Sequence, residues 1–195
     1  ILIGSENGLF SLIERKQQFN SISTHNPQNT PDIISQIEIT DRNFYAGSWG
    51  KGLLKLNPQS RTLEALSFSN YTEISPQFIF SLREIEGNIW FSTKNYLGIF
   101  RFADGLPPYQ LHYYSHFIDE KNQWKKYTVT SILEKRNGDI ILGTWEGILF
   151  YLDEKNDRFK PLKDPNSELP LSENMAIFSL LEDHEGYIWV GINGG

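Results

Sequence analysis

The sequence predicts an all-β fold, and within that class part of a β-propeller, because one short phrase recurs along the whole chain. Each copy has an apolar strand, a polar turn, a second strand that ends in small residues, and a tight turn into a third strand. A period of roughly 40–50 residues built from such short strands is typical of propeller blades. No segment shows a sustained helical period. The small residue that ends the second strand recurs at Gly4, Gly47, Ser92, Gly143 and Gly191.

We expect about four blades of four-stranded antiparallel sheet, three of them complete and two partial, in a single propeller fragment. The opening stretch supplies the last three strands of a blade, and the closing stretch supplies only the first two. These two ends cannot complete one shared blade, so we expect an arc with two uncovered ends. The approximate blade limits are 1–33 (partial), 34–78, 79–128, 129–176 and 177–195 (partial).

The first complete repeat shows how alternation and turn residues assign the strands. Its last turn contains Asn57 and Pro58, which favour a bend. In the third complete repeat, Asn137-Gly138 between two apolar runs is a strong hairpin signal. The strands expected in the first complete repeat are 34–39, 44–48, 52–56 and 62–68.

The middle repeat departs from this period. Its aromatic stretch 107–117 must contain the fourth strand, and the residues up to Lys126, with Trp124 among them, lengthen the connection to the next blade. Glycines in the turns between first and second strands are expected to have positive φ, which glycine adopts at little cost. These glycines are Gly87, Gly138 and Gly186.

Burial follows from the same repeat. Trp90 and Trp189 occupy matched places in their second strands, so both are expected in the core between blades. The full set of side chains expected to be buried is Trp90, Trp189, Ile132, Leu180, Ile37 and Leu82.

Composition excludes several functions. A net charge of −6 argues against nucleic-acid binding, which requires a basic surface. The chain has no cysteine, which removes disulfides, thiol catalysis and Cys-based metal sites. An aromatic content of 14% suits sheets that pack bulky side chains. We find no cofactor-binding pattern and expect neither a cofactor nor a metal.

Three phrases resemble the two-component regulator propeller repeat: Glu-Asp-His-Glu-Gly-Tyr-Ile-Trp-Val-Gly at 182–191, Gly-Asn-Ile-Trp-Phe-Ser-Thr at 87–93 and Gly-Ser-Trp-Gly-Lys-Gly-Leu at 47–53. The resemblance implies the periplasmic sensor region of a hybrid two-component histidine kinase regulator from Bacteroides-type bacteria. Such regulators usually control genes for glycan use. The resemblance further implies an oligosaccharide ligand, and the remaining blades and the signalling domains of a longer protein as partners.

Trp49 and Trp145 differ from the core tryptophans because they follow the small residues, in the turn from second to third strand. An exposed Trp beside polar side chains suits sugar recognition, since a sugar has an apolar ring face and several hydroxyls. The alternative is that these tryptophans cover the end of the core or contact another domain. The candidate ligand-binding residues are Trp49, Lys51, Lys94, Asn95, Tyr96, Trp145, Glu146, Asn7 and Asn193.

Other interpretations remain open. His184 lies among acidic residues, but this is a polar turn in which an Asp caps backbone donors, so we favour a turn over a metal site. The same turn resembles the Asp-box of sialidase-type propellers, yet no catalytic carboxylate pair stands out. A purely structural or protein-interaction propeller is the third reading. Uncovered blade faces recruit other chains, so a homodimer is expected unless neighbouring blades cover the ends 1–3 and 188–192.

Overall fold

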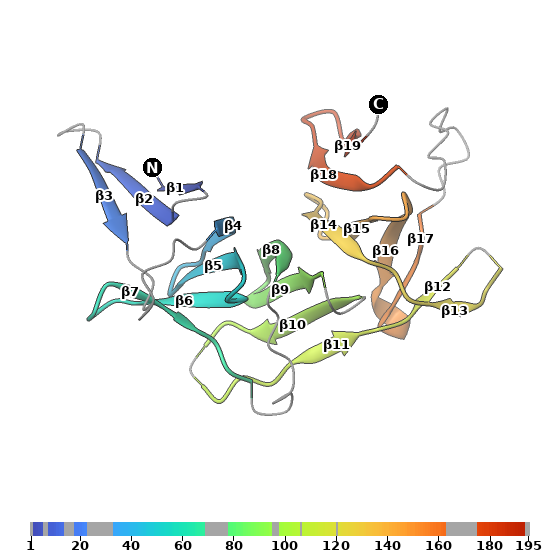
Figure 1. Ribbon diagram of the computed structural model, residues 1–195. Coiled ribbons are helices and arrows are strands. Elements are labelled where there is room, and N and C mark those ends of the chain that lie inside the picture. Colours follow the sequence, from blue (N-terminus) through green and yellow to red (C-terminus); the bar gives the residue numbers. More distant parts are fainter. Residues whose placement is uncertain are drawn as a thin grey trace.

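The computed structural model describes residues 2–5, 8–13, 18–22, 33–68, 78–94, 98–105, 107–119, 121–162 and 175–193. Its sheets follow one another along an arc, with β1 and β19 at the two ends of the open side (Figure 1). Within the described ranges the one helical element is a single 3-10 turn, η1 (Glu154–Asn156). No helix there is long and apolar enough to cross a membrane.

Three sheets have four antiparallel strands, each in the order of the chain, as the sequence predicts. The first of these sheets contains β4 (Ile33–Ile39), β5 (Phe44–Trp49), β6 (Leu53–Asn57) and β7 (Thr62–Ala65). The second contains β8 (Ile79–Ile85), β9 (Asn88–Thr93), β10 (Ile99–Ala103) and β11 (His112–Tyr114). The third contains β14 (Val129–Glu134), β15 (Ile140–Thr144), β16 (Leu149–Asp153) and β17 (Arg158–Pro161).

The arc ends in two smaller sheets, which confirms the expected partial blades. A two-stranded hairpin is also inserted between the second and third large sheets, in the segment expected to lengthen that connection. The three-stranded sheet at the start contains β1 (Leu2–Ser5), β2 (Gly8–Ile13) and β3 (Gln18–Ile22). The inserted hairpin contains β12 (Phe117–Ile118) and β13 (Trp124–Lys125), and the final hairpin contains β18 (Ile177–Glu182) and β19 (Ile188–Ile192).

The apolar core lies between consecutive sheets. One cluster joins Tyr45 and Leu53 of the first large sheet to Phe91 and Phe102 of the second. The next cluster joins the second large sheet to the third and includes Phe159. Because each sheet buries its face against its neighbour, stability depends on having a neighbour.

The same polar contact crosses both interfaces between large sheets. Tyr45 donates its hydroxyl hydrogen to Asp104 Oδ1 at 2.7 Å. Tyr114 donates to Asp157 Oδ1 at 2.6 Å. Burial, and then the hydrogen bond to Asp104, raises the pKa of Tyr45, so this hydroxyl stays protonated as a donor.

Trp90 and Leu82 are buried as expected, at 2% and 4% exposure. Ile37, Ile132 and Leu180 are half-buried.

The prediction that Trp189 is buried is wrong, because its side chain is 64% exposed. Trp90 is covered by Tyr114, whose ring stacks on it at 5.6 Å, and by Phe159 of the next sheet at 6.4 Å. Trp189 belongs to the last described sheet. No described residue covers Trp189 as Phe159 of the next sheet covers Trp90. Its indole Nε1 instead donates to Asp183 Oδ2 at 2.7 Å, and this bond is the main cause that lowers the pKa of Asp183.

The three predicted turn glycines all have positive φ, +74° for Gly87, +89° for Gly138 and +90° for Gly186. Replacing Gly138 by Val should lower the free energy of unfolding by about 1 kcal/mol or more, because a β-branched residue is strained at this φ. A Cβ at this position would have open space, so crowding cannot account for the loss. Urea denaturation would measure the change. Unchanged stability in Gly138→Val would contradict this account of the turn.

Ser92 stands where the four other repeats have Gly, and its side chain is fully buried. Its Oγ has no hydrogen-bond partner within the described part of the chain. Since a buried unsatisfied hydroxyl costs free energy, Ser92→Ala should raise the free energy of unfolding by about 1 kcal/mol. Thermal unfolding of the Ser92→Ala variant would test this. A clear loss of stability in Ser92→Ala would show that the hydroxyl is bonded.

Candidate functional site

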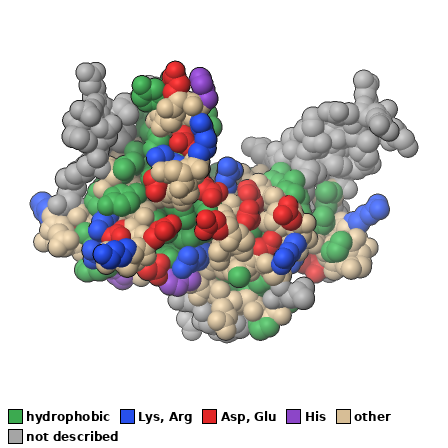
Figure 2. Space-filling view, turned by 180° about the vertical axis from the view of Figure 1, so that it is seen from behind, with side chains coloured by type: hydrophobic (Ala, Val, Ile, Leu, Met, Phe, Trp, Pro, Cys, Tyr) green, Lys and Arg blue, Asp and Glu red, His purple; other side chains and the backbone are tan. Residues whose placement is uncertain are grey.

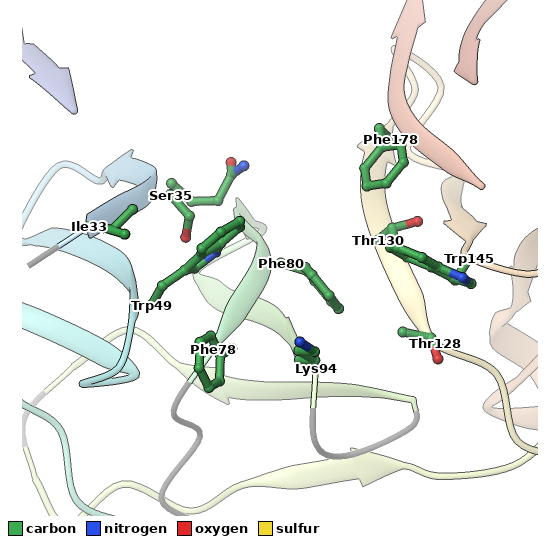
Figure 3. Close-up of a pocket in the computed structure, with 11 residues that line it drawn as sticks. Ile33, Ser35, Trp49, Phe78, Phe80, Lys94, Thr128, Thr130, Trp145 and Phe178 are labelled. Atoms are coloured by element: carbon green, nitrogen blue, oxygen red, sulfur yellow. The ribbon is translucent and has the colours of Figure 1, made fainter. Parts of the chain in front are cut away.

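A pocket of about 770 Å³ lies where the first strands of four successive sheets meet on the inner side of the arc (Figure 3). We call it the inner pocket. Its walls come from β4, β8, β14 and β18 and from residues at or just after the ends of the second strands. The residues that line it are Ile33, Ser35, Gln36, Trp49, Phe78, Phe80, Lys94, Thr128, Thr130, Trp145 and Phe178.

A β-bulge shapes the wall in each of the four repeats whose first and second strands are both described. The pairing of first and second strands shifts by one residue at Ser35, Phe80, Thr130 and Phe178. A bulge bends its strand and re-aims one side chain out of the regular alternation. The four bulged residues all line the inner pocket, so the repeat brings one side chain per sheet to the same place.

Two of the bulged residues are hydroxyls that join neighbouring sheets. Ser35 Oγ donates to the carbonyl oxygen of Ile79 at 2.8 Å. Thr130 Oγ1 donates to the carbonyl oxygen of Ile177. These bonds fix the spacing of the sheets beneath the inner pocket.

The other two bulged residues are rings that flank Trp145. Phe80 stacks on the Trp145 ring at 6.3 Å between centroids, with 27° between planes. Phe178 meets the same indole edge-on at 5.5 Å. Trp145 and Trp49 each remain 48% exposed, so both present ring surface to the inner pocket.

Lys94 has the position in the second large sheet that Trp49 and Trp145 have in their own sheets. Its backbone N donates to the Phe78 carbonyl oxygen at 3.0 Å, as that of Trp145 does to Thr128 at 2.8 Å. The Lys94 ammonium lies 5.5 Å from the Phe78 ring centroid, within range of a cation–π contact. Its side chain is exposed and forms no ion pair with a described carboxylate.

The structure brings together three of the predicted site residues, Trp49, Lys94 and Trp145, in one pocket. Glu146 is adjacent, and both its carboxylate oxygens accept from Thr128 N, at 3.2 and 3.1 Å, so it positions the wall. The other predicted residues fall into two groups: Lys51 and Asn193 are not part of the lining, and Asn7, Asn95 and Tyr96 lie outside the described residues.

Sequence reasoning missed the contribution of the first strands, above all the bulged residues Phe80 and Phe178. The signal was available as equivalent positions in successive repeats. What concealed it is the bulge, because strict alternation would send the bulged side chain to the other face of its strand.

Charge is distributed unevenly over the molecule. Figure 2 shows the molecule from behind, and acidic side chains gather over the middle of this face, in keeping with the net charge of −6. Within the described ranges, no three His, Asp or Glu side chains are arranged so that they could hold a metal ion.

Comparison with known proteins bears on both family and fold. Residues 170–194 match the two component regulator propeller family. This match confirms the resemblance seen in the phrase at 182–191. No curated protein sequence matches the chain.

Solved structures resemble the chain over almost its full length. The extracellular domain of a protein described as a hybrid two component system from B. thetaiotaomicron has a TM-score of 0.73 at 21% identity, over 98% of this chain and 24% of that one. PorZ, a surface component of the type-IX secretion system of Porphyromonas gingivalis, has a TM-score of 0.69 at 15% identity, over 99% of this chain and 30% of that one. The Swd1 β-propeller domain of Myceliophteria thermophila has a TM-score of 0.65 at 10% identity, over 98% and 58%.

The chain spans about a quarter of the length of the B. thetaiotaomicron domain. At such low identity these similarities show the fold, and they confirm the predicted propeller. Residues 170–194 thus match the two component regulator propeller family, and the chain that contains them has a β-propeller fold.

Proposed function

We propose that this chain is a non-catalytic part of the sensor region of a hybrid two-component regulator and that its inner pocket binds an oligosaccharide. The observation that carries the proposal is the lining itself. Exposed indole and phenyl rings stand beside hydroxyls, an amide and an ammonium. Rings bind the apolar face of a sugar, and the polar groups meet its hydroxyls.

The family match and the similar B. thetaiotaomicron domain support the sensor role and a periplasmic location. The chain covers only a small share of that domain, which supports the presence of further blades in a longer protein. That longer protein would also contain a histidine kinase and signalling domains. Within that protein the blades would be 1–33, 34–78, 79–128, 129–176 and 177–195. Binding would control genes for glycan use.

A second candidate is a propeller that contacts protein only. The observation that favours it is the exposed apolar face of β18–β19, where Leu181, Tyr187 and Trp189 are each more than 60% exposed. A neighbouring blade or a second copy would cover this face. A glycoside hydrolase would require acid and base carboxylates, and the described lining of the inner pocket supplies none.

A thermal-shift screen with neutral and acidic oligosaccharides tests the proposal. A ligand that binds only the folded state should stabilise it by about 2.7 kcal/mol at a hundred times its Kd. Trp145→Ala should lose most of the ligand-induced shift, whereas Trp124→Ala, an exposed Trp on the inserted hairpin, should keep it. The absence of a shift with every sugar would contradict oligosaccharide binding. A shift that survives in Trp145→Ala would place the ligand elsewhere.

A further inference from the structure

We propose that the inner pocket selects acidic oligosaccharides, and that the Lys94 ammonium recognises a carboxylate on the sugar. The inference rests on the proposed function and adds the chemical class of the ligand. Three features of the lining support it: its charge, its balance of hydrogen-bond donors and acceptors, and the place of Lys94 between two tryptophans.

The first feature is charge. Lys94 is the one charged side chain among the described residues that line the inner pocket. The lining thus carries a positive charge in a chain whose net charge is −6, while the adjacent Glu146 carboxylate is held by Thr128 N. A local charge opposite to that of the whole molecule attracts an anion to this place in particular.

The second feature is the balance of donors and acceptors. The hydroxyl hydrogens of Ser35 and Thr130 are already donated to carbonyl oxygens of neighbouring sheets. The indole N–H groups of Trp49 and Trp145 have no acceptor within the described residues, and Lys94 adds a three-proton donor. The only amide is that of Gln36, and no carboxylate is present to accept from sugar hydroxyls in the described lining. The Ser35 and Thr130 oxygens keep lone pairs and accept from sugar hydroxyls, whereas the ammonium and the indole N–H groups only donate. Because a carboxylate only accepts hydrogen bonds, these donors fit the carboxylate of a uronate.

The third feature is placement. Trp49, Lys94 and Trp145 hold equivalent positions in three successive sheets, so Lys94 lies between the two tryptophans (Figure 3). A sugar chain that reaches from one indole to the other therefore passes the Lys94 ammonium. The Phe78 ring lies against that ammonium and keeps it at the wall.

Isothermal titration of this chain with trigalacturonate and with its methyl ester tests the inference. The two probes share a shape and differ in charge. We expect the acid to bind roughly tenfold or more tightly than the ester, as for a charge-assisted hydrogen bond, and its affinity to fall with added salt. Lys94→Met should remove the preference, while Lys155→Met, an exposed lysine of η1, should keep it. Circular dichroism would establish that each variant is folded.

The outcomes separate the inference from the proposed function. Equal binding of acid and ester, or an acid preference that survives in folded Lys94→Met, overturns the inference and leaves sugar binding intact. A third outcome is that neutral sugars bind but neither probe does, nor any other uronate oligosaccharide such as trimannuronate. This outcome also overturns the inference and leaves the proposed function intact. If no sugar of either kind binds, the proposed function falls with it.

Discussion

Trp90→Ala should lower the free energy of unfolding by about 3–5 kcal/mol, the largest loss expected from any single substitution considered for this chain. The Trp90 side chain is 2% exposed and packs between Tyr114 and Phe159. Its removal would open a cavity at the interface of two sheets, which the surrounding strands could fill only in part. Urea denaturation monitored by circular dichroism would measure the loss.

Trp189→Ala is the matched control, because Trp189 holds the same position in its own repeat but is 64% exposed. Its loss should be much smaller, because its side chain is already exposed and its hydrogen bond to Asp183 lies near solvent. Equal losses in the two variants would contradict the account in which burial between consecutive sheets stabilises the arc. They would indicate instead that Trp189 is covered in solution, for example by a second copy.

Gly143→Ala should destabilise the chain by about 1–3 kcal/mol, because the interface between sheets has no room for a methyl group at this position. A Cβ on Gly143 would lie 2.5 Å from Ile177 Cγ2 and 2.4 Å from Ser131 Oγ. Ile177 is fully buried, so the close packing around it leaves little room for it to move aside. Gly47 has the same relation to Ile79, at 2.6 Å, so Gly47→Ala should behave alike.

Gly105→Ala is the control for this prediction, since a Cβ there would contact nothing within 4 Å and its φ is not positive. It should leave stability within about 0.5 kcal/mol of the original chain. Differential scanning calorimetry on the three variants would give the comparison. A Gly143→Ala variant as stable as Gly105→Ala would show that the sheets are not so closely packed.

The repeat predicted much of the fold because strands, turns and the contacts between adjacent sheets depend on residues that are close in sequence. The strand limits, the positive φ of Gly138 and the burial of Trp90 each follow from residues within one copy and its immediate neighbour. Trp189 shows where this reasoning fails. Its own repeat is as regular as that of Trp90, but burial is decided by the next sheet rather than by the strand itself.

Only part of the candidate site could be predicted, because only some of its residues are recognisable within a single repeat. Trp49, Lys94 and Trp145 could be recognised because they follow the small residues at the end of a second strand. Phe80 and Phe178 could not, since a bulge re-aims them and a bulge depends on the register between two strands. A pocket formed across four sheets also requires their relative placement, which no single repeat contains.

The central claim, that the inner pocket binds a sugar, can be tested most directly by fluorine NMR on the chain labelled with fluorotryptophan. The five tryptophans give five probes, of which Trp49 and Trp145 line the pocket. Trp124 and Trp189 are at least as exposed but lie elsewhere, and Trp90 is buried. Titration with the oligosaccharide that stabilises the chain most should shift the resonances of Trp49 and Trp145 and leave the other three in place. Shifts confined to Trp124 or Trp189 would contradict the claim.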